Sequence, residues 1–315
     1  METKKILLVV LAAGVAGILG FLGPDKPKGR VGGATIASSF TQQLPIAPDR
    51  VVPKAPTPLA DELDVSIAGL SARAILVKDP VSGYVLFEKG VQTQLPIASL
   101  TKLMTAMVVN RRISSDEIVQ VEAEDVQTPT YRADLVPGEQ IRVGDLLKAM
   151  LISSANDAAL ALARHGGGSV EAFVAEMNQE AARLGMGDTN FQNPVGFDHP
   201  AHFSTAADMS LLVSEFLRYP ELVNIVGTKQ DVVYSVDARR AHELVTTNQL
   251  MMLYDEVVGL KTGYTAEAKG NLIILVDQPS RSGLEYFSII LGSDNREAET
   301  EAIMNWARKS FQWTP

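Results

Sequence analysis

Cysteine is absent from the 315-residue sequence, and its absence excludes three kinds of chemistry. The chain can form no disulfide, has no thiolate nucleophile, and offers no cysteine for attachment of a lipid anchor. Histidine is scarce as well, with four residues. His199 and His202 flank Pro200, which interrupts a regular helix, so the two rings do not share a helical metal-binding face. We therefore expect no metal and no other cofactor.

Positive charge is in short supply after the first 60 residues. The formal net charge is −9, whereas residues 1–60 hold seven Lys/Arg and three Asp/Glu, a balance of +4 that leaves −13 on residues 61–315. An acidic body of this kind argues against nucleic acid as a partner. Hydrophobic residues make up 46% of the chain, enough for the core of a full catalytic domain.

Three short segments supply side chains suited to acyl transfer through a serine ester, and the first is Ser99-Leu100-Thr101-Lys102. A serine hydroxyl is a weak nucleophile until an adjacent base takes its proton. Ser99 begins an apolar run that we expect to be a buried helix, so Lys102 would lie on the same helix face. Burial and a second cation such as Lys261 would lower the pKa of this amine. For this motif alone, a helix-capping serine followed by a solvated lysine is the better interpretation.

The second segment is Ser154-Ala155-Asn156, which lies between two amphipathic stretches, 143–152 and 157–164. We place it in the connection between two helices, where an extended step would direct Ser154 and Asn156 to one side. The alternative is a helix N-cap, in which one of these two residues opens the second helix. The segment by itself does not decide between the two.

The third segment, Lys261-Thr262-Gly263, lies in a predicted strand, 257–265, which would pair antiparallel with the apolar run 272–276. Glycine weakens the interior of a strand, so its presence indicates close approach of another group to the backbone. A peptide lying along the strand, with Lys261 and Thr262 holding its carboxylate, would account for it. The alternative, a bulge with an exposed lysine, requires three independent motifs to coincide.

With their flanking residues, the three segments resemble the low-molecular-mass penicillin-binding proteins of the D-alanyl-D-alanine carboxypeptidase family. The resemblance extends from about Ser71 to Phe311. The similar segments, in chain order, are residues 96–106, 145–147, 153–159, 177–178, 184–186, 193–197, 204–208, 247–250 and 259–265.

This resemblance implies a role for each catalytic side chain. Ser99 would attack the carbonyl of the penultimate D-alanine and form an acyl-enzyme, while Lys102 takes its proton. Ser154 would relay a proton toward the leaving amine, and Asn156 would hold the substrate amide.

The resemblance also implies how substrate is bound. The segment Lys261-Thr262-Gly263 would bind the terminal carboxylate, and the backbone N–H groups of Ser99 and Tyr264 would form the oxyanion hole. Arg296 resembles a family arginine near the carboxylate pocket. It is equally well explained as a solvated arginine at the start of the last helix.

The implied function is hydrolysis of the terminal D-alanine of peptidoglycan stem peptides, with β-lactam antibiotics as covalent inhibitors. A D,D-endopeptidase remains an alternative, because that preference depends on loops around the site, and residues 267–270 depart from the family pattern. A β-lactamase would need a carboxylate that activates water, and no Glu-X-X-Leu-Asn segment lies between Asn156 and Lys261. Intact motifs argue against an inactive wall-binding scaffold.

An uncharged apolar run of 17 residues, 6–22, follows Lys4 and Lys5. This length is at the lower limit for spanning a bilayer and slightly long for a signal-peptide core. Because no small-X-small site follows it directly, we favour an uncleaved membrane anchor over a cleaved signal. Residues 23–60, rich in Pro and Gly, read as a flexible linker, and 61–315 as the catalytic domain. The extracellular substrate of the family places this domain outside the cytoplasmic membrane, in the periplasm or at the cell surface.

The expected fold is α+β, of the β-lactamase/transpeptidase type, with an antiparallel sheet flanked by helices and a mostly helical lobe. The sheet would carry Lys261 and the lobe would carry Ser154 and Asn156, with the site in the cleft between them. The predicted parts are a hairpin over 72–88, a helical block over 99–219, strands near Val232, Val257, Leu272 and 286–291, and a closing helix over 296–311.

Overall fold

The structure, a computed structural model, describes residues 54–59, 67, 69–278 and 284–313. The expected anchor or signal segment, 1–22, and most of the expected linker, 23–60, lie outside the described residues. The end of that linker range is folded, because strand β1 (Thr57–Pro58) pairs with β11 (Phe311–Gln312). Among the described helices, none is both long enough and apolar enough to cross a bilayer.

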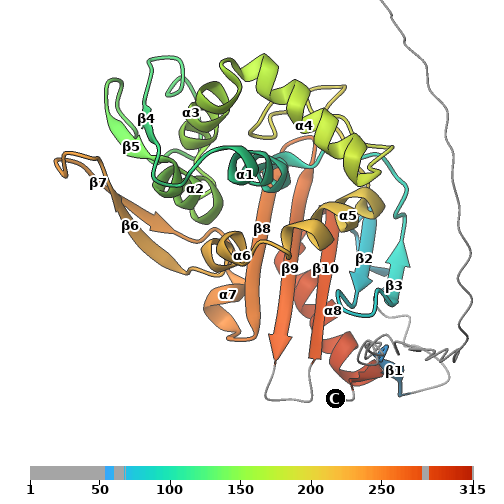
Figure 1. Cartoon of the computed structure of the whole chain (residues 1–315). Helices are drawn as coiled ribbons and strands as arrows, with labels where there is room; N and C mark the ends of the chain where they lie inside the picture. Colours follow the sequence, from blue (N-terminus) through green and yellow to red (C-terminus); the bar gives the residue numbers. More distant parts are fainter. Residues whose placement is uncertain (1–53, 60–66, 68, 279–283, 314–315) are drawn as a thin grey trace, which may run out of the picture. The chain divides into compact units, whose positions relative to one another are not determined.

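Five antiparallel strands form the central sheet, in the order β3-β2-β10-β9-β8 (Figure 1). The predicted N-terminal hairpin is confirmed, and Asp79 Oδ1 stabilises its turn by accepting the backbone N–H groups of Val81 and Ser82. Strand β8, which carries Lys261, lies at one edge of the sheet. The strand bounds are β2 (Ala74–Lys78), β3 (Val85–Lys89), β8 (Val257–Thr265), β9 (Lys269–Gln278) and β10 (Leu284–Ser293).

Both faces of the central strands are buried, which explains their nearly continuous apolar sequences. Successive side chains of a strand point to opposite faces. In β9, Ile273 and Leu275 therefore join the core beneath the helical lobe, whereas Leu272 and Ile274 join a second core that includes Trp306 of the last helix. The sheet is a shared wall between two hydrophobic cores.

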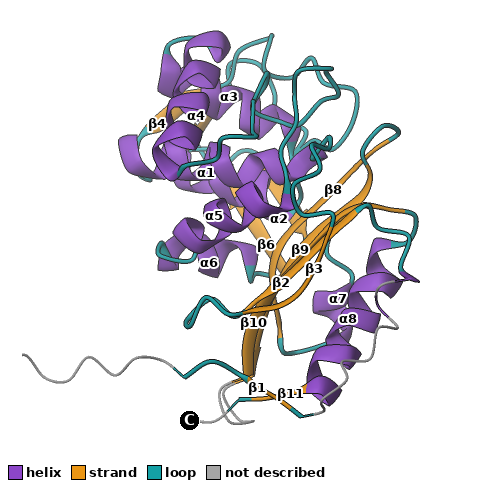
Figure 2. Ribbon diagram, turned by 90° about the vertical axis from the view of Figure 1, so that its right-hand side faces the viewer, coloured by secondary structure: helices purple, strands orange, loops and turns teal. Residues whose placement is uncertain are grey.

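Helices cover the sheet on both sides (Figure 2). Helix α8 (Arg296–Ser310) packs against β9 and β10 on the face opposite the helical lobe, and the short α7 (Leu250–Leu253) contacts β8. The predicted helical lobe and closing helix are thus confirmed. The lobe consists of α1 (Thr101–Arg112), α2 (Val143–Ile152), α3 (Asn156–Gly167), α4 (Val170–Leu184), α5 (Ala206–Phe216) and α6 (Pro220–Val226).

Two short hairpins lie outside the central sheet. Strands β4 (Ile118–Gln120) and β5 (Gln140–Arg142) lie within the block that the sequence predicted to be mostly helical, and these two strands were not predicted. The predicted strand near Val232 exists as β6 (Gln230–Tyr234), but it pairs with β7 (Ala241–Val245) and not with the sheet. Its buried side packs on the core of the lobe, so this hairpin extends the lobe.

Candidate active site

Ser99 lies in a single 3-10 turn, η2 (Ala98–Leu100), that leads directly into α1. Every residue from Thr101 to Val109 is buried, as the apolar run predicted. The side chain of Ser99 does not cap the helix, and Lys102 is 0% exposed. Both features of the capping-serine and solvated-lysine alternative are therefore contradicted.

Lys102 Nζ makes three hydrogen bonds: to Ser99 Oγ at 2.9 Å, Asn156 Oδ1 at 2.7 Å and the carbonyl oxygen of Val195 at 2.9 Å. The carbonyl oxygen of Val195 and the amide oxygen of Asn156 can only accept hydrogen bonds. Asn156 Nδ2 donates to the carbonyl of Thr130, which directs Oδ1 toward the amine of Lys102. A neutral amine has two hydrogens for these two acceptors. Its lone pair then faces Ser99 Oγ, which is the geometry a general base needs.

The electrostatic environment of Lys102 favours the neutral amine. Burial and the positive charge of Lys261 hold its pKa well below the usual 10.5, and the carboxylate of Asp157 opposes them. Asp157 is itself 0% exposed and accepts the backbone N–H groups of Ala133 and Leu135. It thereby fixes the loop whose Thr130 and Tyr131 carbonyls receive hydrogen bonds from Asn156.

The backbone is strained at two positions in these motifs. Ala98, which precedes the nucleophile, has φ +47°, and Ser154 has φ +60°. For residues with a Cβ, this left-handed region costs about 1–2 kcal/mol each. Such strain persists only where surrounding contacts fix the conformation, so its presence beside Ser99 and Asn156 indicates a functional constraint.

The segment with Ser154 and Asn156 connects α2 to α3, as predicted. Ala155 is the N-cap residue of α3, with extended backbone (φ −61°, ψ 120°) and no side-chain cap. Neither neighbouring side chain therefore caps the helix. Ser154 is 3% exposed, and Asn156 Oδ1 accepts a hydrogen bond from Lys102 Nζ.

Lys261 lies in β8 and is 1% exposed, so it is not the exposed lysine of the bulge alternative. Burial first, and the charge of Arg296 second, lower its pKa from 10.5 to about 7. Gly263 allows close approach, as expected: a Cβ there would lie 3.0 Å from the Ile97 carbonyl oxygen and 3.1 Å from Ser99 N. The neighbour of this glycine is the turn that carries the nucleophile, which brings the third motif against the first.

The remaining predicted residues surround Lys261 and Gly263. Thr262 Oγ1 lies 2.5 Å from Thr247 Oγ1, and the side chain of Tyr264 is 59% exposed. Arg296 is the first residue of α8, and its Nη1 donates to the Gly263 carbonyl at 2.7 Å. Its side chain is 18% exposed, so it packs against the strand of the third motif and is not freely solvated.

The segment 193–197 also contributes to the site, although its sequence predicted no role for it. Asn193 Oδ1 accepts the backbone N–H groups of Val195, Gly196 and Phe197 at 3.2, 2.7 and 3.0 Å. This turn aims the Val195 carbonyl at Lys102. A Cβ on Gly196, where φ is +91°, would lie 1.9 Å from the carbonyl oxygen of Ala98. The Asn-Pro-X-Gly spacing is the signal that could have revealed a turn here.

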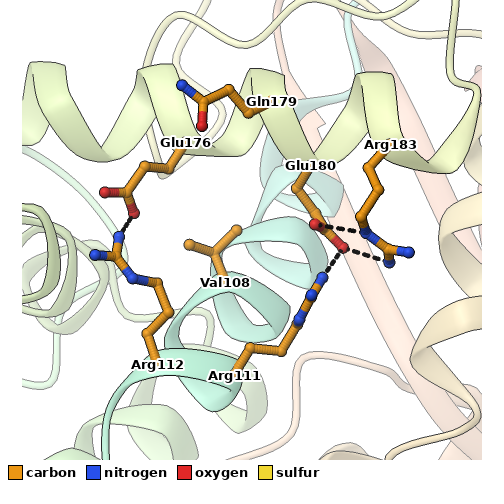
Figure 3. Close-up of a pocket in the computed structure, with 7 residues that line it drawn as sticks. All are labelled: Val108, Arg111, Arg112, Glu176, Gln179, Glu180 and Arg183. Carbon is orange, nitrogen blue, oxygen red and sulfur yellow. Dashed lines mark hydrogen bonds and ion pairs between the residues drawn. The ribbon is translucent and has the colours of Figure 1, made fainter. Parts of the chain in front are cut away.

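Other polar clusters do not belong to this site. Within the described ranges, no group of three or more His, Asp or Glu side chains could hold a metal ion. Figure 3 shows a groove between α1 and α4, whose charged side chains are ion-paired with one another. A second Ser-X-Asn sequence, at Ser293 and Asn295, caps α8, because Asn295 accepts the N–H of Ala298.

A serine hydroxyl hydrogen-bonded to a buried lysine amine, at the start of a helix beneath an antiparallel sheet, defines a site of the Ser–Lys acyl-transfer type. The chain belongs to the D-alanyl-D-alanine carboxypeptidase family, whose model matches residues 61–295.

Individual relatives agree with this assignment. The chain is 31% identical over 254 residues to D-alanyl-D-alanine carboxypeptidase DacF of Bacillus subtilis, and 35% identical over 273 residues to DacC of Escherichia coli. These alignments cover 78% and 82% of this chain, but only 64% and 66% of the two relatives. The crystal structure of the Streptomyces K15 DD-transpeptidase is similar with a TM-score of 0.71 at 27% identity, covering 76% of this chain and 98% of that one. The predicted α+β fold of the penicillin-binding type is confirmed.

Proposed function

We propose that this protein is a serine-type D-alanyl-D-alanine carboxypeptidase that removes the terminal D-alanine from peptidoglycan stem peptides and is acylated by β-lactam antibiotics. One observation carries the proposal. Lys102 Nζ lies 2.9 Å from Ser99 Oγ, and burial together with the positive charge of Lys261 lowers the pKa of this amine toward the neutral form that a base needs. Family membership supplies the substrate class.

In the acylation step, Lys102 takes the proton of Ser99 as its oxygen bonds to the carbonyl carbon of the penultimate D-alanine. The backbone N–H groups of Ser99 and Tyr264 stabilise the negative charge on the carbonyl oxygen. The C–N bond then breaks, and the leaving amine of D-alanine receives the proton through Ser154. This transfer returns Lys102 to the neutral form.

Substrate orientation depends on the groups opposite the nucleophile. Lys261, as an ammonium, and the hydroxyl of Thr262 bind the terminal carboxylate, while Asn156 holds the amide of the substrate. Arg296 adds positive potential, because it lies against the carbonyl of Gly263. These contacts select a free carboxyl terminus.

Deacylation requires water to take the place of the departed D-alanine. Lys102 takes a proton from this water, the new C–O bond forms, and the ester bond to Ser99 breaks with return of the proton to its oxygen. A β-lactam forms the same ester, but its amine remains attached after ring opening and obstructs the approach of water. We expect slow turnover of penicillin, so rapid loss of a bound fluorescent penicillin would favour the β-lactamase alternative.

Mass spectrometry of a purified stem pentapeptide tests the reaction. Incubation with the protein should remove one alanine, and Ser99→Ala should abolish this loss. Release only from cross-linked dimers would favour the D,D-endopeptidase alternative. Full peptidase activity in Ser99→Ala would overturn the assignment of the nucleophile.

We also propose that the protein acts outside the cytoplasmic membrane, held there by residues 6–22. The apolar run and the cell-wall substrate of the family support this location. In fractionated cells, the protein should stay with the membrane after washing with high salt and alkali. Deletion of 6–22 should release the folded domain or prevent its export, and an unchanged membrane fraction would contradict the anchor.

A further inference from the structure

A chain of hydrogen bonds that the proposed reaction does not use reaches the turn that carries Ser99. Thr101 Oγ1 donates to the carbonyl oxygen of Ala98 at 2.8 Å, and His202 Nε2 lies 2.8 Å from Thr101 Oγ1. On the other side of the ring, the backbone N–H of Gln192 donates to His202 Nδ1 at 3.1 Å. Thr101 and His202 are 0% and 3% exposed, so water does not compete for these bonds.

The direction of this chain is fixed at both ends. A backbone N–H can only donate, so His202 Nδ1 carries no proton and its Nε2 does. A carbonyl can only accept, so Thr101 donates its single hydroxyl hydrogen to the carbonyl oxygen of Ala98. The Thr101 oxygen must therefore accept the hydrogen bond from His202. Both constraints require the same neutral tautomer of His202. Burial, with a smaller effect of His199, agrees with this state by lowering the pKa of His202 to about 4.

The ring of His202 is also held from the side. The aromatic ring of Phe191 packs edge-on against it, with centroids 5.8 Å apart and an interplanar angle of 80°. Asn193 Nδ2 lies 3.4 Å from His202 Nδ1, and Asn193 is the residue that organises the Val195 turn. The ring is therefore a fixed support between the turn that holds Lys102 and the turn that carries Ser99.

The carbonyl held by Thr101 belongs to the same peptide group as the backbone N–H of Ser99. A trans peptide is planar, so its C=O and N–H point in opposite directions, and fixing one fixes the other. We propose that His202, acting through Thr101, is a positioning residue that sets the direction of the Ser99 N–H. This inference rests on the proposed function, in which that N–H binds the oxyanion.

Two matched pairs of substitutions separate this role from simple packing. Thr101→Val keeps the shape of the side chain but removes the hydroxyl, whereas Thr101→Ser keeps the hydroxyl. His202→Asn removes the donor to Thr101, whereas the longer His202→Gln places an N–H₂ near the position of Nε2. The probe is a fluorescent penicillin, with non-covalent affinity and the rate constant of acylation measured separately.

Thr101→Val and His202→Asn should each lower the acylation rate constant about tenfold, because the oxyanion donor loses its alignment. Non-covalent affinity should change less than about twofold. Thr101→Ser and His202→Gln should stay within about threefold of the wild-type rate. The double variant Thr101→Val/His202→Asn should also lose about tenfold, since the two residues act in one chain.

An unchanged acylation rate in Thr101→Val overturns the inference, as does an equal loss in His202→Gln and His202→Asn. If the variants do not fold, nitrogen-15 NMR of the wild-type protein decides: the spectrum should show neutral His202 with its proton on Nε2. A proton on Nδ1, or a charged ring at neutral pH, overturns the proposal. If the wild-type protein takes up no fluorescent penicillin, the proposed function fails and the inference with it.

Discussion

The pKa of the Lys261 side chain predicts how the activity of the protein depends on pH. Its pKa of about 7 means that the ammonium form is lost as pH rises through neutrality. Since we assign that charge to carboxylate binding, kcat/KM for the pentapeptide should fall above about pH 7. Arg296→Gln removes one of the two causes of the lowered pKa of Lys261, so this pKa should rise. The fall of kcat/KM should then occur at higher pH.

The control for this measurement is Lys269→Gln, which removes an exposed cation paired with Asp294. In this variant, kcat/KM should fall at the same pH as in the wild-type protein. Superimposable pH profiles for Arg296→Gln and the wild-type protein would show that the Arg296 charge does not act on Lys261.

His202 should also make the stability of the protein depend on pH. Its pKa is about 4 in the folded chain against 6.5 for an ordinary histidine, so between these values the unfolded state binds the extra proton. Stability from this group is complete above pH 6.5 and is lost as pH falls toward 4, by up to about 3 kcal/mol. Urea unfolding should show this slope in the wild-type protein and a shallower one in His202→Gln. Equal slopes would contradict it.

For individual residues, the sequence predicted that Ser99 and Lys102 lie together, but it did not predict all the contacts of Lys102. Helical spacing placed Lys102 beside Ser99, and the apolar run implied burial of the amine. The carbonyl of Val195 could not be predicted, because every residue type has one and the contact spans 93 positions. Likewise, no composition rule distinguishes a catalytic Ser-X-Asn from the sequence that caps α8.

Among the structural elements, the turn at Gly196 tolerates the least change. A Cβ would clash with the Ala98 backbone, and the φ of +91° disfavours any side chain. Gly196→Ala should lower stability by roughly 3 kcal/mol and reduce acylation, because the turn of Ser99 must shift. Thermal unfolding and penicillin labelling measure both effects.

Gly187→Ala is the matched control, because its added Cβ meets nothing within 4 Å. It should change stability by less than about 0.5 kcal/mol. Normal labelling and stability in Gly196→Ala would mean that the turn can move without disturbing Ser99.

Ion pairs join α1 to α4 along the groove of Figure 3. Glu180 accepts Arg183 at 2.7 Å and Arg111 at 2.5 Å, and the bond from Arg183 is the main reason why the pKa of Glu180 is lowered. Such partly exposed pairs contribute about 0–1 kcal/mol each and weaken in salt. Glu180→Gln should therefore cost at most about 1 kcal/mol at low salt and less in 1 M salt. Its acylation rate should equal that of the wild-type protein, and a slower rate would link this groove to the site.

Sequence patterns predicted most elements and two of the strand pairings, β2 with β3 and β8 with β9, but not the partner of every strand. The strands of the central sheet were recognised because alternating or continuous apolar residues indicate a buried strand, whereas β4, β5 and β7 were not predicted. The β6–β7 hairpin has the same alternation, yet its buried face packs on the lobe. Sequence patterns show which side of a strand is buried and leave open what covers it.

At the scale of the whole molecule, β1 joins the two ends of the described fold. It pairs with β11, and the N–H of Leu59 donates to the carbonyl of Ser310 at 2.8 Å. A protein without residues 1–53 keeps β1 and serves as the reference for this test. Removal of residues 1–60 should lower the melting temperature by a few degrees. A decrease of about 1 kcal/mol in the free energy of unfolding lowers the melting temperature of a domain of this size by roughly 2–4 °C. Identical melting curves for the two truncations would contradict this role of β1.

The order of the central sheet has a consequence for when the protein becomes active. Strand β2 is interior, and its partner β10 follows it by about 200 residues of chain. The N-terminal hairpin therefore stays without its main neighbour until β10, residues 284–293, has been synthesised, and contacts so distant in sequence form slowly. An emerging chain already carries its nucleophile but lacks the strand with Lys261 and the helix with Arg296. We therefore expect labelling by a β-lactam only in chains extended past Arg296, and shorter nascent chains should remain unlabelled.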